Sequence, residues 1–196
     1  MFLARPVGAG RVQGLLDARE QARVVAQGGS AAVASAYALL RLVIGVNAPM
    51  TAVCGTCGGP HGRPVLLDDS GRHVSVSHTA GLVAVAVSAD GPVGVDVERP
   101  DATGFDGFAA LALAAGEQAD DDAARARLWT AKEAVRKATG EGLSTPLNAL
   151  RLDRLGAGLH LLEVDAPAGW TCSAAVLAAR SPVLYIGDGD ALLAPL

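Results

Sequence analysis

The sequence predicts an α+β fold built mainly from antiparallel strands. Apolar residues recur with helical spacing over residues 15–45 and again over about residues 120–139. Short apolar or alternating runs follow each helical region and are separated by turns rich in Asp, Ser and Gly. A helix followed by strands therefore occurs twice, which favours two packed halves, residues 1–92 and 93–196.

The first helical region is expected to contain two helices. "LLDAREQARVVAQ" has helical apolar spacing, and Gly28-Gly29 interrupts it. Ser30 can cap a second helix, "AAVASAYALLRLVIG", which is expected to end at Gly45. Residues 46–64 are rich in Gly and Pro and are expected to form turns.

Two strand pairs are predicted next. "PVLLDDSGRHVSVSH" contains a strand, a turn and an alternating strand, and "LVAVAVSADGPVGVDVE" repeats this form. The Ala-rich residues 105–119 are expected to be helical. A further helix is predicted from Asp120-Asp121-Asp122, whose charges favour a helix N-terminus, to about Thr139, with Gly140 as its stop. The remaining strands are predicted at "ALRLDRL", "GLHLLEV", "WTCSAAVLA" and "VLYIG".

The composition excludes several classes of protein. The chain has 196 residues, 51% of them apolar and 18% charged, so it can bury a core and is not expected to be disordered. Its net charge of −4 argues against nucleic acid as the main ligand. The most apolar stretch, "YALLRLVIGV", is interrupted by Arg41 and is too short to span a bilayer. The N-terminus lacks the apolar run of a signal peptide, so we expect a cytoplasmic protein that binds no membrane.

The cysteines do not suggest a disulfide framework, because there are only three, Cys54, Cys57 and Cys172. "CGTCGGPH" offers Cys54, Cys57 and His61 as ligands of a zinc knuckle, but a structural zinc site takes four ligands. We favour the alternative, a Gly-rich loop with reduced thiols.

"GVDVE" is the first stretch that carries chemistry. Asp96 and Glu98 lie two residues apart on a predicted strand, so both carboxylates project from one face, while Val95 and Val97 point into the core. Adjacent carboxylates repel each other unless water or a cation separates them, and oxygen ligands of this kind suit Mg²⁺. The alternative is an acidic strand face exposed to solvent.

"WTAKEAVRKATG" holds Lys132 and Lys137, the only lysines among 16 basic residues. On a helix, Trp129, Glu133 and Lys137 share one stripe, since they are four residues apart. An ordinary ion pair between Glu133 and Lys137 is the simpler interpretation. It does not explain lysine in a chain that otherwise uses arginine. A compact, titratable ammonium suits a site that holds phosphate oxygens or passes a proton to a leaving group.

"GRP" and "SVSHTAG" form the third group. Ser77 and His78 end a predicted strand, and Arg63 precedes it. A hydroxyl, an imidazole and a guanidinium are typical of phosphate binding, although a Ser-His pair is often only a polar strand end. A serine hydrolase is disfavoured because the sequence contains no G-x-S-x-G.

In this order and spacing, the motifs resemble those of 4′-phosphopantetheinyl transferases of the surfactin-synthetase (Sfp) type. The family pattern is Gly-Lys/Arg-Pro, Asn-x-Ser-His, Gly-x-Asp-x-Glu and Trp-x-x-Lys-Glu-x-x-x-Lys. The corresponding stretches here are "GRP", "SVSH", "GVDVE" and "WTAKEAVRK", within residues 62–143. The resemblance implies a pseudo-dimeric α+β fold of two similar halves, each with a helix packed on a small antiparallel sheet.

The resemblance also implies an activity. The 4′-phosphopantetheine arm of coenzyme A (CoA) would be transferred, with Mg²⁺, to a serine of an acyl or peptidyl carrier protein, and 3′,5′-ADP would be released. CoA would lie between the halves, with residues 1–92 on its binding side and residues 93–196 carrying the metal and the catalytic helix. With both halves in one chain, we expect a monomer.

Residue roles follow from the same resemblance. Asp96, Glu98 and Glu133 would hold Mg²⁺ on the pyrophosphate. Lys137 would steady the α-phosphate, and Glu133 would accept the proton of the carrier serine. The implied catalytic residues are Glu133, Lys137 and Asp96. The implied CoA-binding residues are Arg41, Arg63, Ser77, His78, Lys132 and Lys137, with Lys132 beside the metal-bound phosphates.

The sequence departs from the family pattern in three places. Val74-Ser75 replaces an aromatic residue and Asn before x-Ser-His. The region that normally supplies basic residues for the 3′-phosphate has only Arg41 in its second helix, so Arg19, Arg23 or Arg41 would substitute. "GFDGFAALALAAGEQ" replaces an opening Arg-Phe-Phe.

Two other functions remain as alternatives. One is a catalytically weakened relative that binds CoA or a carrier protein. The other is a magnesium-dependent phosphatase or nucleotide-binding enzyme that uses the same acidic residues.

Overall fold

The computed structural model describes residues 1–54, 58–59, 62–142 and 145–196. The strands are β1 (Phe2–Ala4), β2 (Met50–Thr51), β3 (Val65–Leu66), β4 (His73–Thr79), β5 (Leu82–Ser88), β6 (Val93–Glu98), β7 (Leu159–Val164), β8 (Thr171–Leu177) and β9 (Gly187–Asp188). The α-helices are α1 (Ala9–Val12), α2 (Ala18–Ala26), α3 (Ala31–Ile44), α4 (Phe108–Ala112), α5 (Asp122–Thr139) and α6 (Gly189–Leu193). Short 3-10 turns are η1 (Gln13–Leu15), η2 (Pro100–Thr103), η4 (Leu147–Ala149) and η5 (Leu152–Arg154).

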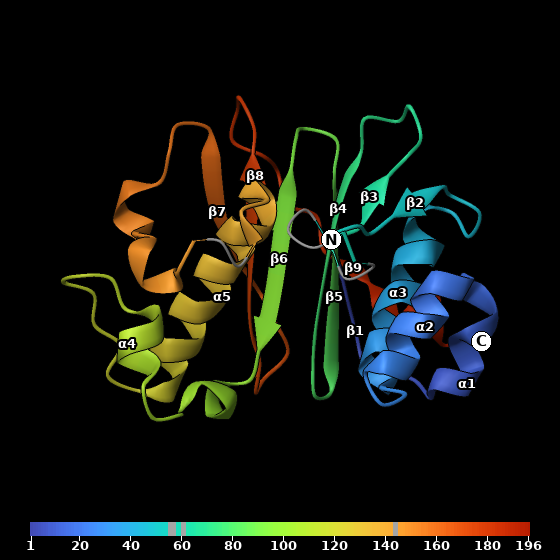
Figure 1. Cartoon of the computed structure of the whole chain (residues 1–196), viewed down its shortest axis with the longest axis horizontal. Coiled ribbons are helices and arrows are strands. Elements are labelled where there is room, and N and C mark those ends of the chain that lie inside the picture. The colour runs from blue at the N-terminus through green and yellow to red at the C-terminus, as the bar shows by residue number, and fades with distance from the viewer. Residues whose placement is uncertain (55–57, 60–61, 143–144) are drawn as a thin grey trace.

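Helices cover two outer sides of the molecule, and the strands lie between them (Figure 1). One sheet has the order β4-β5-β1-β9, and another has the order β6-β8-β7. Side chains alternate between the two faces of β5, so each face packs into a different core. Val83 and Val85 pack with α3, whereas Leu82, Ala84 and Ala86 pack against β6 and β8. The inner faces of the two sheets therefore meet in an apolar layer that joins the halves.

The two larger sheets are built in the same way. In chain order, β1, α3, β4 and β5 give the antiparallel arrangement β1-β5-β4. In the same order, β6, α5, β7 and β8 give the antiparallel arrangement β6-β8-β7. Each set is a small sheet with a helix on its outer face, because α3 packs on β4 and β5 while α5 packs on β6 and β8.

The C-terminal residues return to the sheet β4-β5-β1-β9. The predicted division into residues 1–92 and 93–196 did not include this crossing. β9 pairs in parallel with β1, and α6 packs on α3 and β1. The side chain of Arg11 donates to the carbonyl oxygen of Leu196 at 2.8 Å. The last residues thus complete the N-terminal half, and Figure 1 places the C-terminus beside α1.

Other predicted elements can be compared with the structure. The breaks between α2 and α3 and the extent of α5 are confirmed, and Ser30 Oγ accepts from the N–H of Val33 as the predicted cap. Helix in residues 105–119 is confirmed only for α4. The strand predicted at 149–155 is wrong, since this segment contains 3-10 turns. The strand predicted at 183–187 is confirmed only at Gly187, where β9 begins, and residues 183–186 are irregular. Within the described ranges, no helix has both the length and the hydropathy to cross a bilayer.

α5 packs on β6 at its closest point over Gly94. A Cβ atom at this position would overlap the carbonyl oxygen of Ala134 and lie 2.6 Å from the backbone nitrogen of Ala138. Both obstacles are helix backbone and cannot rotate away as a side chain can. The glycine of "GVDVE" therefore sets the distance between helix and sheet, and Asp96 and Glu98 project on that same face.

Gly94→Ala should consequently destabilise the fold by about 2–3 kcal/mol, because the added methyl must push α5 away from β6. Gly10→Ala is the matched control, since Gly10 lies in α1 and a Cβ there meets nothing within 4 Å. That change should be neutral or slightly stabilising. Urea denaturation of both variants measures the difference. Equal midpoints for Gly94→Ala and the unmodified chain would contradict the packing argument.

Candidate functional site

The candidate site lies where β4, β6 and α5 meet, and Asp96 is at its centre. Asp96 is only 7% exposed. Its Oδ1 atom accepts from Ser77 Oγ of β4 at 2.7 Å and from Lys137 Nζ of α5 at 2.7 Å. A carboxylate is costly to bury without such partners. Three elements that are distant in sequence thus contribute one polar cluster.

Lys137 is anchored by two oxygens of β6. Its ammonium donates to Asp96 and to the carbonyl oxygen of Val95 at 2.9 Å. The side chain remains 28% exposed. Lys137 therefore offers a positive charge that is fixed in place and reachable from solvent, next to the acidic residues. This is suitable for contact with a phosphate group.

Glu133 lies one helical turn before Lys137 and is half-buried. Its Oε1 accepts from Arg136 Nη1 at 3.0 Å. Burial raises the pKa of Glu133, and the nearby charge of Asp96 raises it further, while Arg136 and Lys137 act in the opposite direction. Asp96 is therefore near enough for its charge to act on the Glu133 carboxyl group. A glutamate with a raised pKa is also better suited to accept a proton near neutral pH.

Glu98 completes the acidic face of β6. Its Oε2 accepts from Thr79 Oγ1 at 2.8 Å and from the N–H of Arg99 at 3.0 Å. Asp96 and Glu98 project from the face predicted from their spacing. Val95 and Val97 point the other way and are 0% and 1% exposed, so that part of the prediction is confirmed.

The three carboxylates match Mg²⁺ in donor chemistry but do not form a closed metal cluster. In the part of the chain that the structure describes, no three His, Cys, Asp or Glu side chains are grouped closely enough to hold a metal ion. One oxygen of each carboxylate carries the hydrogen bonds described above: Asp96 Oδ1, Glu98 Oε2 and Glu133 Oε1. The second oxygen of each is the atom that a cation would take.

Cationic side chains lie beside the acidic residues. Desolvation lowers the pKa of His78, and the positive charges of Lys137 and Arg23 lower it further, whereas Asp96 raises it. The charges of Arg23, from the N-terminal half, and of Lys137, from the C-terminal half, therefore both act on the pKa of His78. Arg63 Nη1 donates to the carbonyl oxygen of Lys137 at 3.0 Å, at the C-terminus of α5. This arrangement favours a bound anion.

Ser77, which was predicted to bind CoA, makes its contacts within the protein. It is only 6% exposed, and its hydroxyl donates to Asp96 and accepts from the N–H of Val97 at 3.3 Å. Both contacts are internal. The hydroxyl therefore supports a site residue, and of the predicted pair only His78 is exposed.

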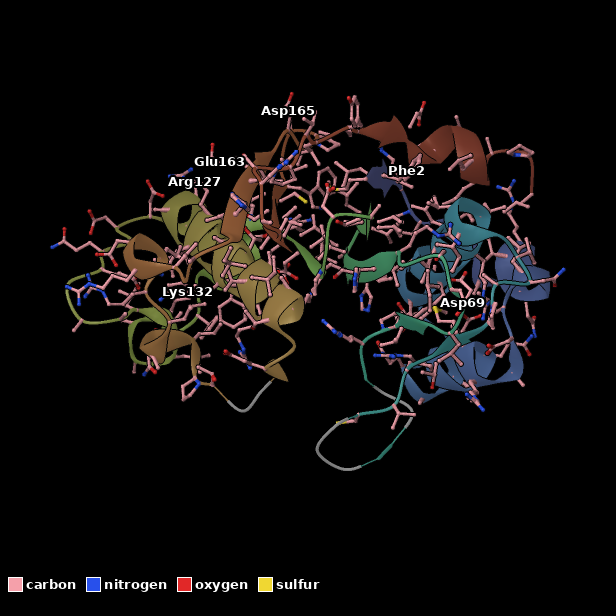
Figure 2. The ribbon with its side chains drawn as sticks, turned by 90° about the horizontal axis from the view of Figure 1, so that it is seen from above. Phe2, Asp69, Arg127, Lys132, Glu163 and Asp165 are labelled. Carbon is pink, nitrogen blue, oxygen red and sulfur yellow. The ribbon has the colours of Figure 1, made fainter. Side chains whose placement is uncertain are left out.

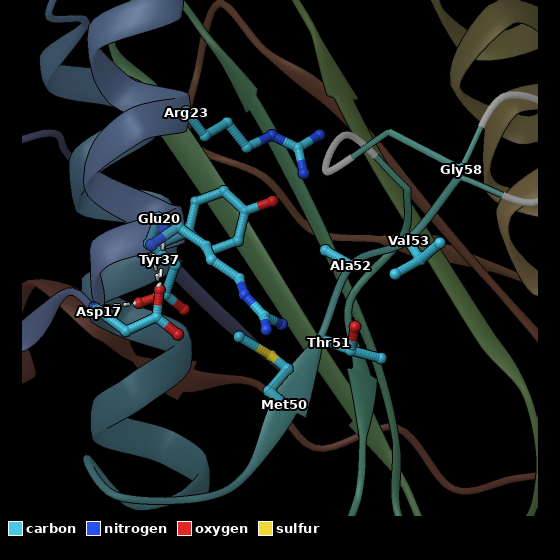
Figure 3. Close-up of a pocket in the computed structure, with 10 residues that line it drawn as sticks. Asp17, Glu20, Arg23, Tyr37, Met50, Thr51, Ala52, Val53 and Gly58 are labelled. Atoms are coloured by element: carbon cyan, nitrogen blue, oxygen red, sulfur yellow. Dashed lines mark hydrogen bonds between the residues drawn. The ribbon is translucent and has the colours of Figure 1, made fainter.

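A pocket of about 180 Å³ adjoins α2 and α3. Figure 3 shows Arg23 and Tyr37 on one side of it and the segment from Met50 to Val53 on the other. The guanidinium of Arg23 lies 5.3 Å from the centre of the Tyr37 ring and donates to the carbonyl oxygen of Gly62 at 3.2 Å. Arg19 also lines the pocket. Two of the three arginines considered for the 3′-phosphate therefore lie at a cavity.

Arg41, the third, has a structural role instead. It is 4% exposed, and its guanidinium contacts Glu20 at 2.9 Å and Asp17 at 2.8 Å. It also donates to the carbonyl oxygens of Val46 and Ala48. These partners tie α2 and the turn after α3 together. These donors are directed at the protein, so the structure gives no support to the expectation that Arg41 binds CoA, which stays a prediction.

Lys132 also departs from its expected role beside metal-bound phosphates. It is 0% exposed, and its ammonium donates to Glu117 Oε2 at 2.5 Å and to the carbonyl oxygens of Ala112 and Leu147 at 2.6 and 3.1 Å. Figure 2 shows it within the part of the molecule formed by α5 and its neighbours, away from the strands. Lys132 thus joins α5 to α4 and η4, and its ammonium is directed at these buried oxygens.

The cysteines give little support to a metal centre. Cys57 and His61 lie outside the described residues, so the zinc-knuckle alternative is not addressed by the structure. Cys172 is buried, and burial raises the pKa of its thiol to about 12, with the Asp96 charge acting in the same direction. Such a thiol is a poor metal ligand because metal binding requires the thiolate.

Several residues of the site were not found from the sequence. Ser75 and Thr79 lie on the same face of β4 as Ser77. The alternation of side chains along a strand would have been enough to predict this from the sequence. Glu117, the partner of Lys132, lies in a segment predicted as helix, and nothing in its local sequence marks it. Its role depends on a contact between residues 15 positions apart.

Lys132→Met should destabilise the chain by about 3 kcal/mol, because it leaves Glu117 and two carbonyl groups without their buried partner. Lys137→Met should cost less, since water can reach that position. Chemical denaturation measures both. Adding Glu117→Gln to Lys132→Met should restore part of the loss by removing the unpaired charge. A double variant as unstable as the sum of the single changes would contradict a direct pair.

Parts of this sequence are similar to known proteins. An uncharacterised protein, YieE, of Escherichia coli strain K12 is 33% identical over 116 residues, which are 54% of this chain and 47% of YieE. A putative 4′-phosphopantetheinyl transferase, slr0495, of Synechocystis is 34% identical over 103 residues, which are 46% of this chain and 41% of that protein. The matched regions thus span less than half the length of these relatives.

The family comparison coincides with the candidate site. β6, α5, β7 and β8 provide the acidic residues and Lys137. These elements fall within residues 92–184, which match the family model of the 4′-phosphopantetheinyl transferase superfamily.

Proposed function

We propose that this protein transfers the 4′-phosphopantetheine arm of CoA to a serine of an acyl or peptidyl carrier protein, with Mg²⁺, and releases 3′,5′-ADP. The observation that carries the proposal is the cluster of Asp96, Glu133 and Lys137 at the junction of β4, β6 and α5. It lies within the segment that matches the superfamily.

The reaction needs a negatively charged leaving group and an activated hydroxyl. The serine oxygen forms a bond to the phosphorus that carries pantetheine, and the bond from this phosphorus to the ADP oxygen breaks. Because charge gathers on the leaving phosphate, cations beside it lower the barrier. Lys137 supplies such a charge. Glu133, with its raised pKa, accepts the serine proton.

Asp96, Glu98 and Glu133 would hold Mg²⁺ through the carboxylate oxygens that carry none of the hydrogen bonds described above. When bound, Mg²⁺ neutralises the pyrophosphate of CoA. The carboxylates themselves keep the site anionic and so discriminate against phosphate that arrives without a cation. Arg63 and His78 lie near Lys137 and would contact the phosphates.

The nucleotide end of CoA would lie toward the pocket lined by Arg19, Arg23 and Tyr37. Arg41 does not contribute there, so fewer basic groups contact the 3′-phosphate than the family pattern provides. We therefore expect a high KM for CoA. We further propose the Sfp type and a monomer, supported by two similarly built helix-and-sheet units in one chain.

The proposal is tested by the intact mass of an apo carrier protein incubated with this protein, CoA and Mg²⁺, beside a chelator control. A magnesium-dependent gain of one phosphopantetheine is expected. Absence of any gain on fatty-acid, polyketide and peptide-synthetase carriers, with the protein folded, would contradict transferase activity. If CoA or a carrier still binds, a weakened relative becomes the explanation. Hydrolysis of free CoA or nucleotides without a carrier would favour the phosphatase alternative.

Asp96→Asn should lower the transfer rate on the order of 100-fold or more, because the amide keeps the shape but loses the charge that holds the cation. The fold should persist, since an amide oxygen can still accept from Ser77 and Lys137. Asp101→Asn, an exposed acidic residue paired with Arg99, is the control and should keep normal transfer. Initial rates over a range of Mg²⁺ concentrations give the readout. Normal rates for Asp96→Asn at ordinary Mg²⁺ would exclude Asp96 as a metal ligand.

His78 should report the bound anion through its pKa. Its lowered pKa means that the folded chain takes up this proton less readily than the unfolded chain. The contribution of His78 to stability is therefore present above about pH 6.5 and is lost as the pH falls. An anion between Arg23 and Lys137 favours the imidazolium, so 3′,5′-ADP should raise the pKa of His78. NMR titration of the ring protons, assigned with His78→Gln, measures the change.

The His160 ring bonds to the carbonyl oxygen of Ala178, on the opposite side of the second sheet from this cluster, and its signals should not respond to the ligand. An unchanged His78 pKa at saturating 3′,5′-ADP would place the anion elsewhere.

A further inference from the structure

Among the residues that the structure describes, the strand that carries the acidic residues has one edge without a neighbouring strand. β6 is the end strand of the order β6-β8-β7, and β4 is the end strand of the neighbouring sheet. β6 and β4 are in contact, but within the described residues they form no backbone ladder. Val95 and Val97 are fully buried, so their N–H groups need acceptors other than water.

Hydroxyl groups of β4 supply these acceptors. Ser75 Oγ accepts from the N–H of Val95 at 3.0 Å, and Ser77 Oγ accepts from the N–H of Val97 at 3.3 Å. Ser75 and Ser77 are 4% and 6% exposed, so the contacts are shielded from water. The side chains of one strand thus take the place of the missing neighbouring strand.

The same row of hydroxyls reaches the carboxylates. Ser77 Oγ donates to Asp96 at 2.7 Å, and Thr79 Oγ1 donates to Glu98 at 2.8 Å. Residues 75, 77 and 79 alternate along β4 and therefore lie on one face. Each hydroxyl holds either the backbone of β6, a carboxylate of β6, or both.

We infer that Ser75, Ser77 and Thr79 are positioning residues that fix β6 and orient Asp96 and Glu98 toward a divalent cation. The hydroxyl contacts one oxygen of each carboxylate, so the cation is expected at the second oxygen. Groups of this kind commonly change metal affinity by about 10-fold or more when removed. The consequence for transfer rests on the proposed function, whereas the consequences for metal binding and for strand geometry do not.

Thr79 permits the sharpest test. Thr79→Val keeps the shape but removes the hydroxyl, and Thr79→Ser keeps the hydroxyl but removes a methyl. Binding of Mn²⁺ to the full chain, followed by electron paramagnetic resonance, should weaken about 10-fold in Thr79→Val and remain near normal in Thr79→Ser. Ser88→Ala is the control, because its hydroxyl accepts from the nearby N–H of Asp90 and has no other partner among the residues that the structure describes. Equal Mn²⁺ affinity in Thr79→Val and Thr79→Ser would overturn the assignment.

Ser75 allows a second readout that needs no metal. In Ser75→Ala the N–H of Val95 loses its acceptor, so its exchange with solvent should become about 10-fold faster, as expected for one lost hydrogen bond. Amides at the centre of β5 should keep their protection. Unchanged exchange at Val95 would show that the hydroxyl does not hold the edge of β6.

Transfer assays separate this inference from the proposed function. If the unmodified chain binds Mn²⁺ but transfers nothing to any carrier, the function is wrong while the Thr79 comparison still decides the positioning role. If the unmodified chain transfers normally, Thr79→Val should require about 10-fold more Mg²⁺ at a similar maximal rate. Unaltered Mg²⁺ dependence in that variant would overturn the inference and leave the function standing.

Discussion

The backbone of α5 lies on Gly94 more closely than any side chain at that position would allow. This contact sets the distance between the helix and β6, and the site depends on it. Asp96 projects from the same strand face two residues later. It accepts a hydrogen bond from Lys137, and its charge repels that of Glu133. A larger residue at 94 would separate the charged groups as it separated the backbones. The same glycine thus serves both packing and electrostatics.

Bringing these charges together has an energetic cost that the neighbouring side chains offset. Glu133 and Asp96 repel each other, and both are at least half-buried. Lys137 and Arg136 oppose the repulsion, and Ser77 supplies a hydrogen bond. The remaining negative potential would attract a cation. A site of this kind is less stable than an apolar one but is prepared for its ligand.

The two lysines of the chain serve different purposes on one helix. Lys132 and Lys137 are five residues apart, which places them about 140° apart around the helix axis. Lys132 faces the interior and joins three oxygens, whereas Lys137 faces β6 and solvent. A tetrahedral ammonium with three donors fits separated oxygens better than a planar guanidinium does. The choice of lysine therefore has a structural reason at 132 and an electrostatic one at 137.

The sequence by itself determined the long helices, their caps and the central strands, because these depend on periodicity and on local capping residues. It also identified Asp96, Glu133 and Lys137 as a group, through spacing and family resemblance. It did not reveal β1 or β9, since strands of three and two residues have no recognisable period. It assigned Arg41 and Lys132 to ligand contacts because a side chain's partner cannot be deduced from its own segment. Only the tertiary structure decided that Arg41 pairs with Asp17 and Glu20 and that Lys132 pairs with Glu117. It also decided that the hydroxyl groups of β4 bind the backbone of β6. These contacts join residues that are distant in the chain, and packing of whole elements brings them together.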